Sequence, residues 1–163
     1  MESTISFVSV SHILMAIGGL IGLIILFNSF VIVGGDEIVV LERRWFGKKI
    51  AEGRIFALSD EVGIQVRNLM PGFHFLVPFL YKCQKQKITN IEENQVGIVE
   101  SLDGQPIPNN RIFGKKVDGH SNYQDGEAFL KNGGEKGVQI ELLPPGDYRI
   151  NPELFNVSNR PMV

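Results

Sequence analysis

The residues able to perform acid–base, nucleophilic or metal chemistry are few and widely spaced in this chain. None of the three histidines, His12, His74 and His120, lies at metal-ligand spacing from another histidine or from the single Cys83. Asp118 is close to His120 in sequence, but no nucleophile motif accompanies this acid–base pair. We therefore predict that the protein is not an enzyme and uses no metal and no cofactor. We expect a packed or interfacial His74, a His120 that hydrogen-bonds within its own loop, and an inert thiol at Cys83.

Composition and one glycine-rich segment exclude further classes. With 16 basic and 18 acidic side chains the formal net charge is -2, so we expect no nucleic-acid partner. A single cysteine leaves no intramolecular disulfide. Residues 132–137 (NGGEKG) lack the G-K-[ST] ending of a phosphate-binding loop and follow a predicted helix instead of opening one, which favours a cap and turn.

Four cationic residues gather shortly after an uncharged segment: Arg43, Arg44, Lys48 and Lys49. Near a membrane surface each such residue attracts anionic lipid headgroups by about 1 kcal/mol, so this cationic cluster is a candidate anionic-lipid site. The alternative is that these residues only set the orientation of the chain. Trp45 lies within the cluster, and both an interfacial anchor and a place in the core of a sheet are open to it.

The element that would position this cluster is the uncharged segment at residues 13–33 (ILMAIGGLIGLIILFNSFVIV). Its 21 residues, at ~1.5 Å each, make a helix of about 31 Å, which matches the hydrocarbon thickness of a bilayer. A cleaved signal peptide fits poorly, because no Lys or Arg precedes the segment and no A-x-A-like site follows it. We predict an N-terminal tail at residues 1–12 and a transmembrane helix at 13–33.

The charge distribution predicts the orientation of this helix. Cationic residues follow the segment and none precedes it, which places the C-terminal side in the cytoplasm. Gly18 and Gly22 form a G-x-x-x-G pair, a pattern that lets two helices pack closely. The alternative is that these glycines reflect only the ordinary glycine content of spanning helices.

The rest of the chain reads as two diverged copies of one β pattern. We predict an α+β fold with a first, membrane-proximal β repeat at residues 36–87 and a second at 88–163. The matching segments are EIVVLE at 37–42 and QVGIVE at 95–100, GRIF at 53–56 and NRIF at 110–113, and GIQVRNLMPG at 63–72 and GVQIELLPPG at 137–146. The second copy carries an insertion at about 114–136, with a short helix that Asp125 can cap and Gly133 can end.

The closing strands of the two repeats differ in polarity. Residues 73–80 are almost wholly apolar, whereas residues 147–154 alternate. We therefore predict that a set of apolar side chains in the first repeat meets lipid or a neighbouring subunit: Phe73, Phe75, Leu76, Phe79 and Leu80. A central core strand, buried on both faces, is the alternative that the pattern leaves open.

The apolar N-terminal segment, the β run after it and the motif LMPGFHFLVP at 69–78 resemble the SPFH superfamily, also called band 7, of stomatins, prohibitins and flotillins. Residues 119–137 and the motif PPGDYRINPELF at 144–155 resemble the N-terminal region of large bacterial flotillin-like members. The resemblance implies an SPFH-type domain in an oligomeric scaffold, located here in a bacterial inner membrane. Family members usually continue into a long helical coil, and nothing after Val157 has heptad character.

Two functions are compatible with this resemblance. The first is a homo-oligomeric scaffold that organises a membrane microdomain or encloses membrane proteins. The second is a regulatory subunit that docks onto a membrane protease or transporter. A large homo-oligomer would favour the scaffold, and a stoichiometric enzyme partner would favour the regulator.

Overall fold

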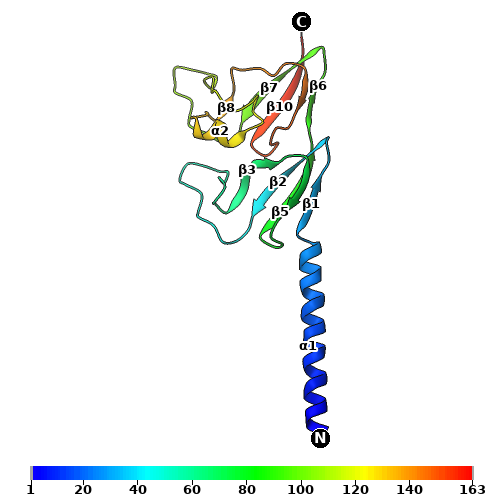
Figure 1. The fold of residues 1–163 in the computed structure, drawn as a ribbon. Coiled ribbons are helices and arrows are strands. Elements are labelled where there is room, and N and C mark those ends of the chain that lie inside the picture. Colours follow the sequence, from blue (N-terminus) through cyan, green and yellow to red (C-terminus); the bar gives the residue numbers. More distant parts are fainter. Residues whose placement is uncertain (1, 163) are drawn as a thin grey trace.

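The protein combines one long N-terminal helix with a β-rich body, so the predicted α+β class is correct at this level. This computed structural model describes residues 2–162, with side chains from residue 10 onward. Helix α1 (Glu2–Phe27) stands clear of the body (Figure 1). Its stretch Val10–Phe27 is long and apolar enough, by length and composition, to cross a membrane, and none of it is buried.

The end of α1 differs from the sequence prediction. The helix was predicted at 13–33 after a tail at 1–12, whereas α1 begins at Glu2 and ends at Phe27. Asn28 and Ser29 close its last turn, because their side chains donate to the carbonyls of Ile24 and Ile25 at 2.8 Å each. The next residues form strand β1 (Phe30–Val33), since three consecutive β-branched side chains favour a strand and a partner strand lies alongside.

The body consists of two five-strand units. Unit 1 contains β1 and four further strands: β2 (Glu37–Arg43), β3 (Gly63–Leu69), β4 (Gly72–Phe75) and β5 (Tyr81–Lys87). Unit 2 contains the other five: β6 (Thr89–Ile91), β7 (Gln95–Ser101), β8 (Gly137–Val138), β9 (Gly146–Tyr148) and β10 (Phe155–Pro161). Each unit has an antiparallel three-stranded sheet, in the orders β3-β2-β5 and β8-β7-β10, and a two-stranded ribbon, β1-β4 or β6-β9.

The strand pairings of the two units are the same residue by residue. Positions 58 apart in the first two strands (Glu37 and Gln95) and 74 apart in the last three (Gly63 and Gly137) are equivalent. With these offsets, the pair of Leu41 and Cys83 in unit 1 is equivalent to the pair of Val99 and Val157 in unit 2. In the same way, the pair of Val31 and His74 is equivalent to the pair of Thr89 and Tyr148. The irregular register between β2 and β3 also recurs, because Val39↔Leu69 is matched by the bridge Gly97↔Leu143. The body is therefore built from one motif used twice.

A partly buried ion pair stabilises the loop between the second and third strands of each unit. The guanidinium of Arg54 binds Glu61 in unit 1, and Arg111 binds Glu135 at 2.6 Å in unit 2. Each carboxylate also accepts a backbone N–H, from Leu58 or Lys115, at 2.9 and 2.8 Å. The hydrogen bond from Arg111 holds the pKa of Glu135 below its usual value, against the opposing effect of burial.

The matched backbone bonds also locate the insertion. Lys48 donates to the carbonyl of Asp60 in unit 1, and Gln105 donates to that of Gly134 in unit 2. The extra residues of unit 2 therefore lie between Lys115 and Gly134, within the predicted range of about 114–136. They include the predicted short helix, α2 (Gly126–Lys131), whose N-cap Asp125 accepts from the N–H of Ala128 at 2.9 Å.

The two units stack through a shared apolar core. Phe56 and Val66 of unit 1 belong to the same buried cluster as Phe129 of α2 and Leu154 and Phe155 of unit 2. A smaller core beneath sheet β3-β2-β5 is formed by Val33, Val39, Leu41 and Leu69. Figure 1 shows unit 1 next to α1 and unit 2 beyond it, with α2 between the layers. Unit 1 is therefore the part of the body nearest to the predicted bilayer.

Candidate membrane-contact surface

The β1-β4 ribbon presents an apolar face to solvent. Phe30 pairs with Phe75 and Ile32 with Phe73, so these four side chains share one face of the ribbon. The rings of Phe30 and Phe73 stack with centroids 4.9 Å apart, and Phe75 meets Phe30 edge-on at 5.6 Å. Despite these contacts Ile32 and Phe73 remain 66% and 65% exposed. The alternative of a core strand buried on both faces is therefore wrong for β4 in the single chain.

The equivalent ribbon of unit 2 is polar on the same face. Ile32 and Phe73 correspond to Asn90 and Asp147, which also pair directly, and the Asn90 amide donates to the Asp147 carboxylate at 2.6 Å. Because backbone and register are shared, the fold itself does not require apolar side chains at these positions. We therefore infer that the apolar face of ribbon β1-β4 is an adaptation to an apolar partner that ribbon β6-β9 does not meet.

A turn at residues 76–80 extends this apolar surface. Phe79 is 75% exposed and has a φ of +65°, a left-handed conformation that is costly for a bulky side chain. Leu76 and Leu80 are only half-buried, and Leu76 packs against the small core of unit 1. Of the predicted contact residues, Phe73, Phe75 and Phe79 therefore have exposed side chains, and Leu76 and Leu80 are exposed only in part.

A second turn, at the end of β2, presents two more aromatic side chains. Trp45 is exposed, so the alternative that it belongs to a sheet core is wrong, and Phe46 beside it is 88% exposed with a φ of +53°. Arg43 braces this turn, because its guanidinium donates to the carbonyls of Trp45, Phe46 and Ser59. The guanidinium of Arg43 is thus occupied by the turn, while the aromatic side chains of Trp45 and Phe46 stay exposed.

The other members of the cationic cluster are exposed. Arg44 and Lys49 extend into solvent, and Lys48 lies 3.9 Å from Asp60 in a pair whose two side chains are both largely exposed. Such a pair contributes little, since water screens it. Three of the four predicted anionic-lipid residues are therefore accessible next to Trp45 and Phe46.

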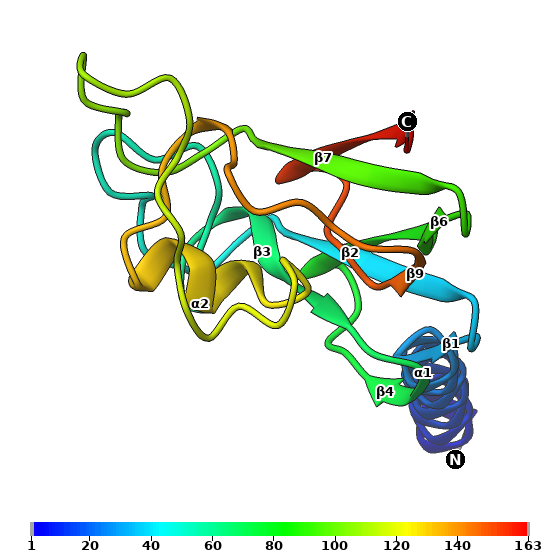
Figure 2. The ribbon, with the colours of Figure 1, turned by 90° about the horizontal axis from the view of Figure 1, so that it is seen from above.

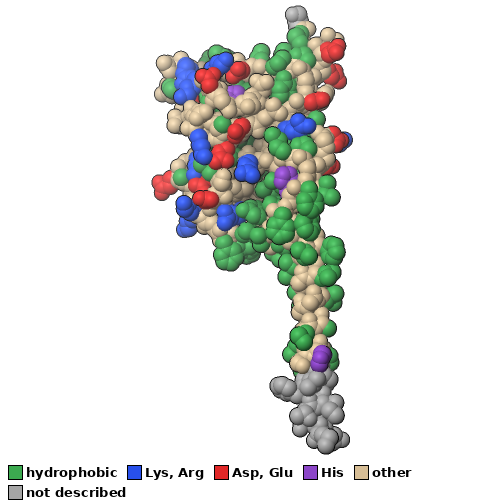
Figure 3. All heavy atoms as spheres, in the orientation of Figure 1, with side chains coloured by type: hydrophobic (Ala, Val, Ile, Leu, Met, Phe, Trp, Pro, Cys, Tyr) green, Lys and Arg blue, Asp and Glu red, His purple; other side chains and the backbone are tan. Residues whose placement is uncertain are grey.

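The apolar side chains of this surface are continuous with the root of α1. Figure 3 shows hydrophobic side chains gathered at the lower edge of the body where the helix joins it, with cationic side chains above them. Viewed along the helix, the body lies to one side of α1 (Figure 2). Sequence reasoning missed Phe30, Ile32 and Phe46; the Asn28–Ser29 interruption is the sequence signal that separates β1 from the helix.

Gly18 and Gly22 lie on α1, outside the body. A Cβ atom at either position would meet no other atom within 4 Å, so this side of the helix is open in the single chain. The predicted close packing with a second helix stays a prediction.

The histidines and the cysteine of the body have structural surroundings. His120 accepts from the N–H of Tyr123 at 2.8 Å and its ring stacks on that of Tyr123. The ring of His74 lies 2.7 Å from the carbonyl of Met70. Cys83 is half-buried, and burial raises the pKa of its thiol. Among the described residues, no three His, Cys, Asp or Glu side chains gather as a metal site.

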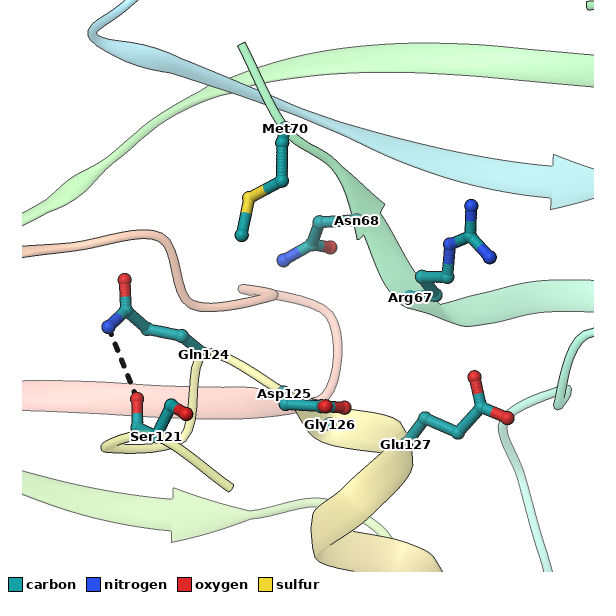
Figure 4. A pocket seen from close by; sticks show the side chains of 8 residues that line it. All are labelled: Arg67, Asn68, Met70, Ser121, Gln124, Asp125, Gly126 and Glu127. Carbon is teal, nitrogen blue, oxygen red and sulfur yellow. Dashed lines mark hydrogen bonds between the residues drawn. The ribbon is translucent and has the colours of Figure 1, made fainter. Parts of the chain in front are cut away.

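A hollow of about 390 Å³ lies between β3 and the insertion (Figure 4). Three of its polar side chains serve the local structure: Asp125 caps α2, the Gln124 amide donates to the Ser121 carbonyl at 3.1 Å, and Glu127 pairs with Lys131. The hydrogen bond from Lys131 lowers the pKa of Glu127. The hollow offers no arrangement of a base next to a nucleophile.

Comparison with known proteins adds no relative. No family model, no curated protein and no solved structure matches this chain.

Proposed function

We propose that this chain is a membrane-anchored, non-catalytic scaffold subunit of the flotillin or band 7 type, with unit 1 seated on the cytoplasmic surface of a bacterial inner membrane. The observation that carries the proposal is the difference between two equivalent ribbons. The ribbon next to the membrane helix exposes Ile32 and Phe73, where the distant ribbon exposes Asn90 and Asp147.

The short connection to α1 limits what this face can meet. Phe30 follows Phe27, the last helical residue, by three positions, so the ribbon begins at most about 11 Å from the helix end. At that distance the exposed aromatic side chains reach the headgroup region, where aromatic residues are favoured. Burying one such side chain contributes about 1.5–3 kcal/mol. The bilayer surface is therefore the partner that best accounts for an uncovered apolar face.

Depth-dependent quenching tests this seating. A fluorophore attached at Phe73→Cys, in a Cys83→Ser background and in vesicles containing doxyl-labelled lipid, should be strongly quenched. The matched control is Asp147→Cys, which lies at the equivalent exposed position of unit 2 and should be quenched several-fold less. Equal quenching at both positions would show that unit 1 is not seated on the bilayer.

The scaffold role rests on assembly, which the sequence resemblance favours and the open glycine side of α1 accommodates. In gentle detergent, electron microscopy should show large closed homo-oligomeric particles. A monodisperse monomer would contradict the scaffold and leave the regulatory subunit as the better function. Co-purification of a membrane protease or transporter in fixed stoichiometry would support that alternative directly.

A further inference from the structure

In each three-stranded sheet, the face that points away from α1 carries nearly the same side chains, but these side chains differ in burial. In sheet β3-β2-β5 the face toward unit 2 is covered: Ile38 and Val66 are 0% and 1% exposed, and Val40 and Phe56 are also buried. The equivalent residues in and beside sheet β8-β7-β10 are Val96, Ile98, Ile140 and Phe113. Ile140 is 61% exposed and Phe113 is exposed beside it. Val96 and Ile98 are half-buried. The second sheet thus repeats the apolar face that unit 2 covers in the first sheet, but no further unit among residues 2–162 packs on it.

Two polar side chains of unit 2 form hydrogen bonds with the backbone of unit 1 at the covered junction. The Asp103 carboxylate of unit 2 accepts from the N–H groups of Ile55 and Phe56 at 2.8 and 2.9 Å. The Asn151 amide of unit 2 donates to the carbonyls of Gln65 and Val66 at 3.0 and 3.1 Å. These two side chains therefore join the second unit to the backbone of the first.

On unit 2 the same four backbone groups are open. They are the N–H groups of Ile112 and Phe113 and the carbonyls of Gln139 and Ile140, and none of them makes a hydrogen bond within residues 2–162. A unit that brought an equivalent carboxylate and amide would satisfy all four. The open face therefore matches the covered one in apolar and polar groups alike.

The residues that follow β5 and β10 make equivalent backbone hydrogen bonds. Ile88, the residue that enters unit 2, donates its N–H to the carbonyl of Asp36 at 3.2 Å. Met162 donates to the carbonyl of Asn94 at 2.8 Å, which is the equivalent bond one unit later. The backbone after β10 is thus held in the same way as the backbone after β5, and it lies at the end of the body farthest from α1 (Figure 1).

We propose that the face of sheet β8-β7-β10 that points away from unit 1, together with the segment after β8, is a docking face for a further β unit of the same build as units 1 and 2. The face is formed by Val96, Ile98, Val138, Ile140 and Leu142. The contact between unit 2 and the docked unit repeats the contact between units 1 and 2, as in stacked repeat proteins. A second copy stacked head to tail fits less well, because its unit 1 carries α1 and the apolar ribbon, which would be lifted away from the bilayer.

Thiol labelling of an extended chain tests this proposal. The full chain is compared with a version in which residues 88–163 are repeated directly after Pro161, both with Cys83→Ser and a single Ile140→Cys in the original unit 2. We expect labelling to slow about tenfold or more in the extended chain, because packed side chains react only through local opening. The matched control is Ile112→Cys, which should react equally in both chains, since its counterpart Ile55 stays 57% exposed beside unit 2.

Three outcomes would overturn the proposal. Unchanged labelling at Ile140→Cys means that the face does not receive the unit, whether the extension is folded or not. Protection that already occurs in the unextended chain and grows with protein concentration identifies a second copy as the occupant. Protection that survives Asp103→Ala and Asn151→Ala in the added unit means that the junction was not reproduced.

Discussion

A chain carrying Leu20→Arg and Ile21→Arg should be lost from the membrane fraction and released by alkaline carbonate, whereas the unchanged chain should resist extraction. Both residues lie near the middle of the apolar stretch Val10–Phe27 and are exposed along α1. An arginine at the centre of a spanning helix costs about 2.5–3.5 kcal/mol, so the two together cost about 5–7 kcal/mol. Without a spanning helix, unit 1 can hold the chain only at the bilayer surface, from which alkaline carbonate releases it.

The matched control for this experiment is Leu20→Met with Ile21→Val, which keeps the helix apolar and should remain membrane-bound. The N-terminus of the mature protein should be determined in parallel by mass spectrometry. A freely soluble protein lacking the first thirty or so residues would contradict the anchor, since those residues would then be a cleaved leader.

Truncation of Phe129 to alanine should lower the free energy of unfolding of the body by about 3–5 kcal/mol. Phe129 is fully buried at the junction of the two units, and its ring meets those of Phe155 and Tyr123 at centroid distances of 5.1 and 5.9 Å. Gly134 lies so close to the ring that no Cβ would fit there. The surroundings are therefore packed too closely to collapse into the space left by the ring.

Hydrogen exchange of the β7 and β10 amides in detergent or nanodiscs measures this effect. Ile112→Ala is the matched control, because Ile112 is among the most exposed side chains and its truncation should change stability by less than about 0.5 kcal/mol. A loss below about 1 kcal/mol for Phe129→Ala would mean that α2 does not fill the junction.

The role of Phe129 also explains why unit 2 carries an insertion. Phe155 contacts both Tyr123 and Phe129 of the inserted segment, and its counterpart in unit 1 is Tyr81. Unit 1 lacks an insertion, and a hollow of about 160 Å³ remains beside Tyr81, Leu41 and Leu69. The insertion therefore completes the core of the unit that lies farther from the predicted membrane.

Much of the body could be predicted from local sequence. The Pro-Gly turns were recognisable because only glycine readily adopts the positive φ that Gly72 and Gly146 have, +136° and +149°. The cap of α2 was recognisable because Asp125 precedes a run of good helix formers. The insertion was recognisable from the change of offset between matched segments, and the strand pairings carry the same offsets.

Local sequence could not place the end of α1 or assign the roles of the cationic cluster. Residues 13–33 are uniformly apolar, and the strand state of Phe30–Val33 depends on β4, some forty residues later in the chain. Arg43 and Arg44 are adjacent and alike in sequence, yet only Arg43 reaches the carbonyls of the turn that it braces. Both outcomes depend on contacts between residues distant in the chain.

Periodicity, turn chemistry and the internal match were enough to establish a long apolar helix followed by a β motif used twice. They could not establish which apolar side chains are interior, because Val40 and Ile98, or Val66 and Ile140, are chemically equivalent in the sequence. That distinction arises only when unit 2 covers one sheet and no further unit of the described chain covers the other. Whether an apolar side chain is buried depends on which element packs against it, because burial removes its surface from water only where a partner covers it. The identity of one side chain does not specify that partner.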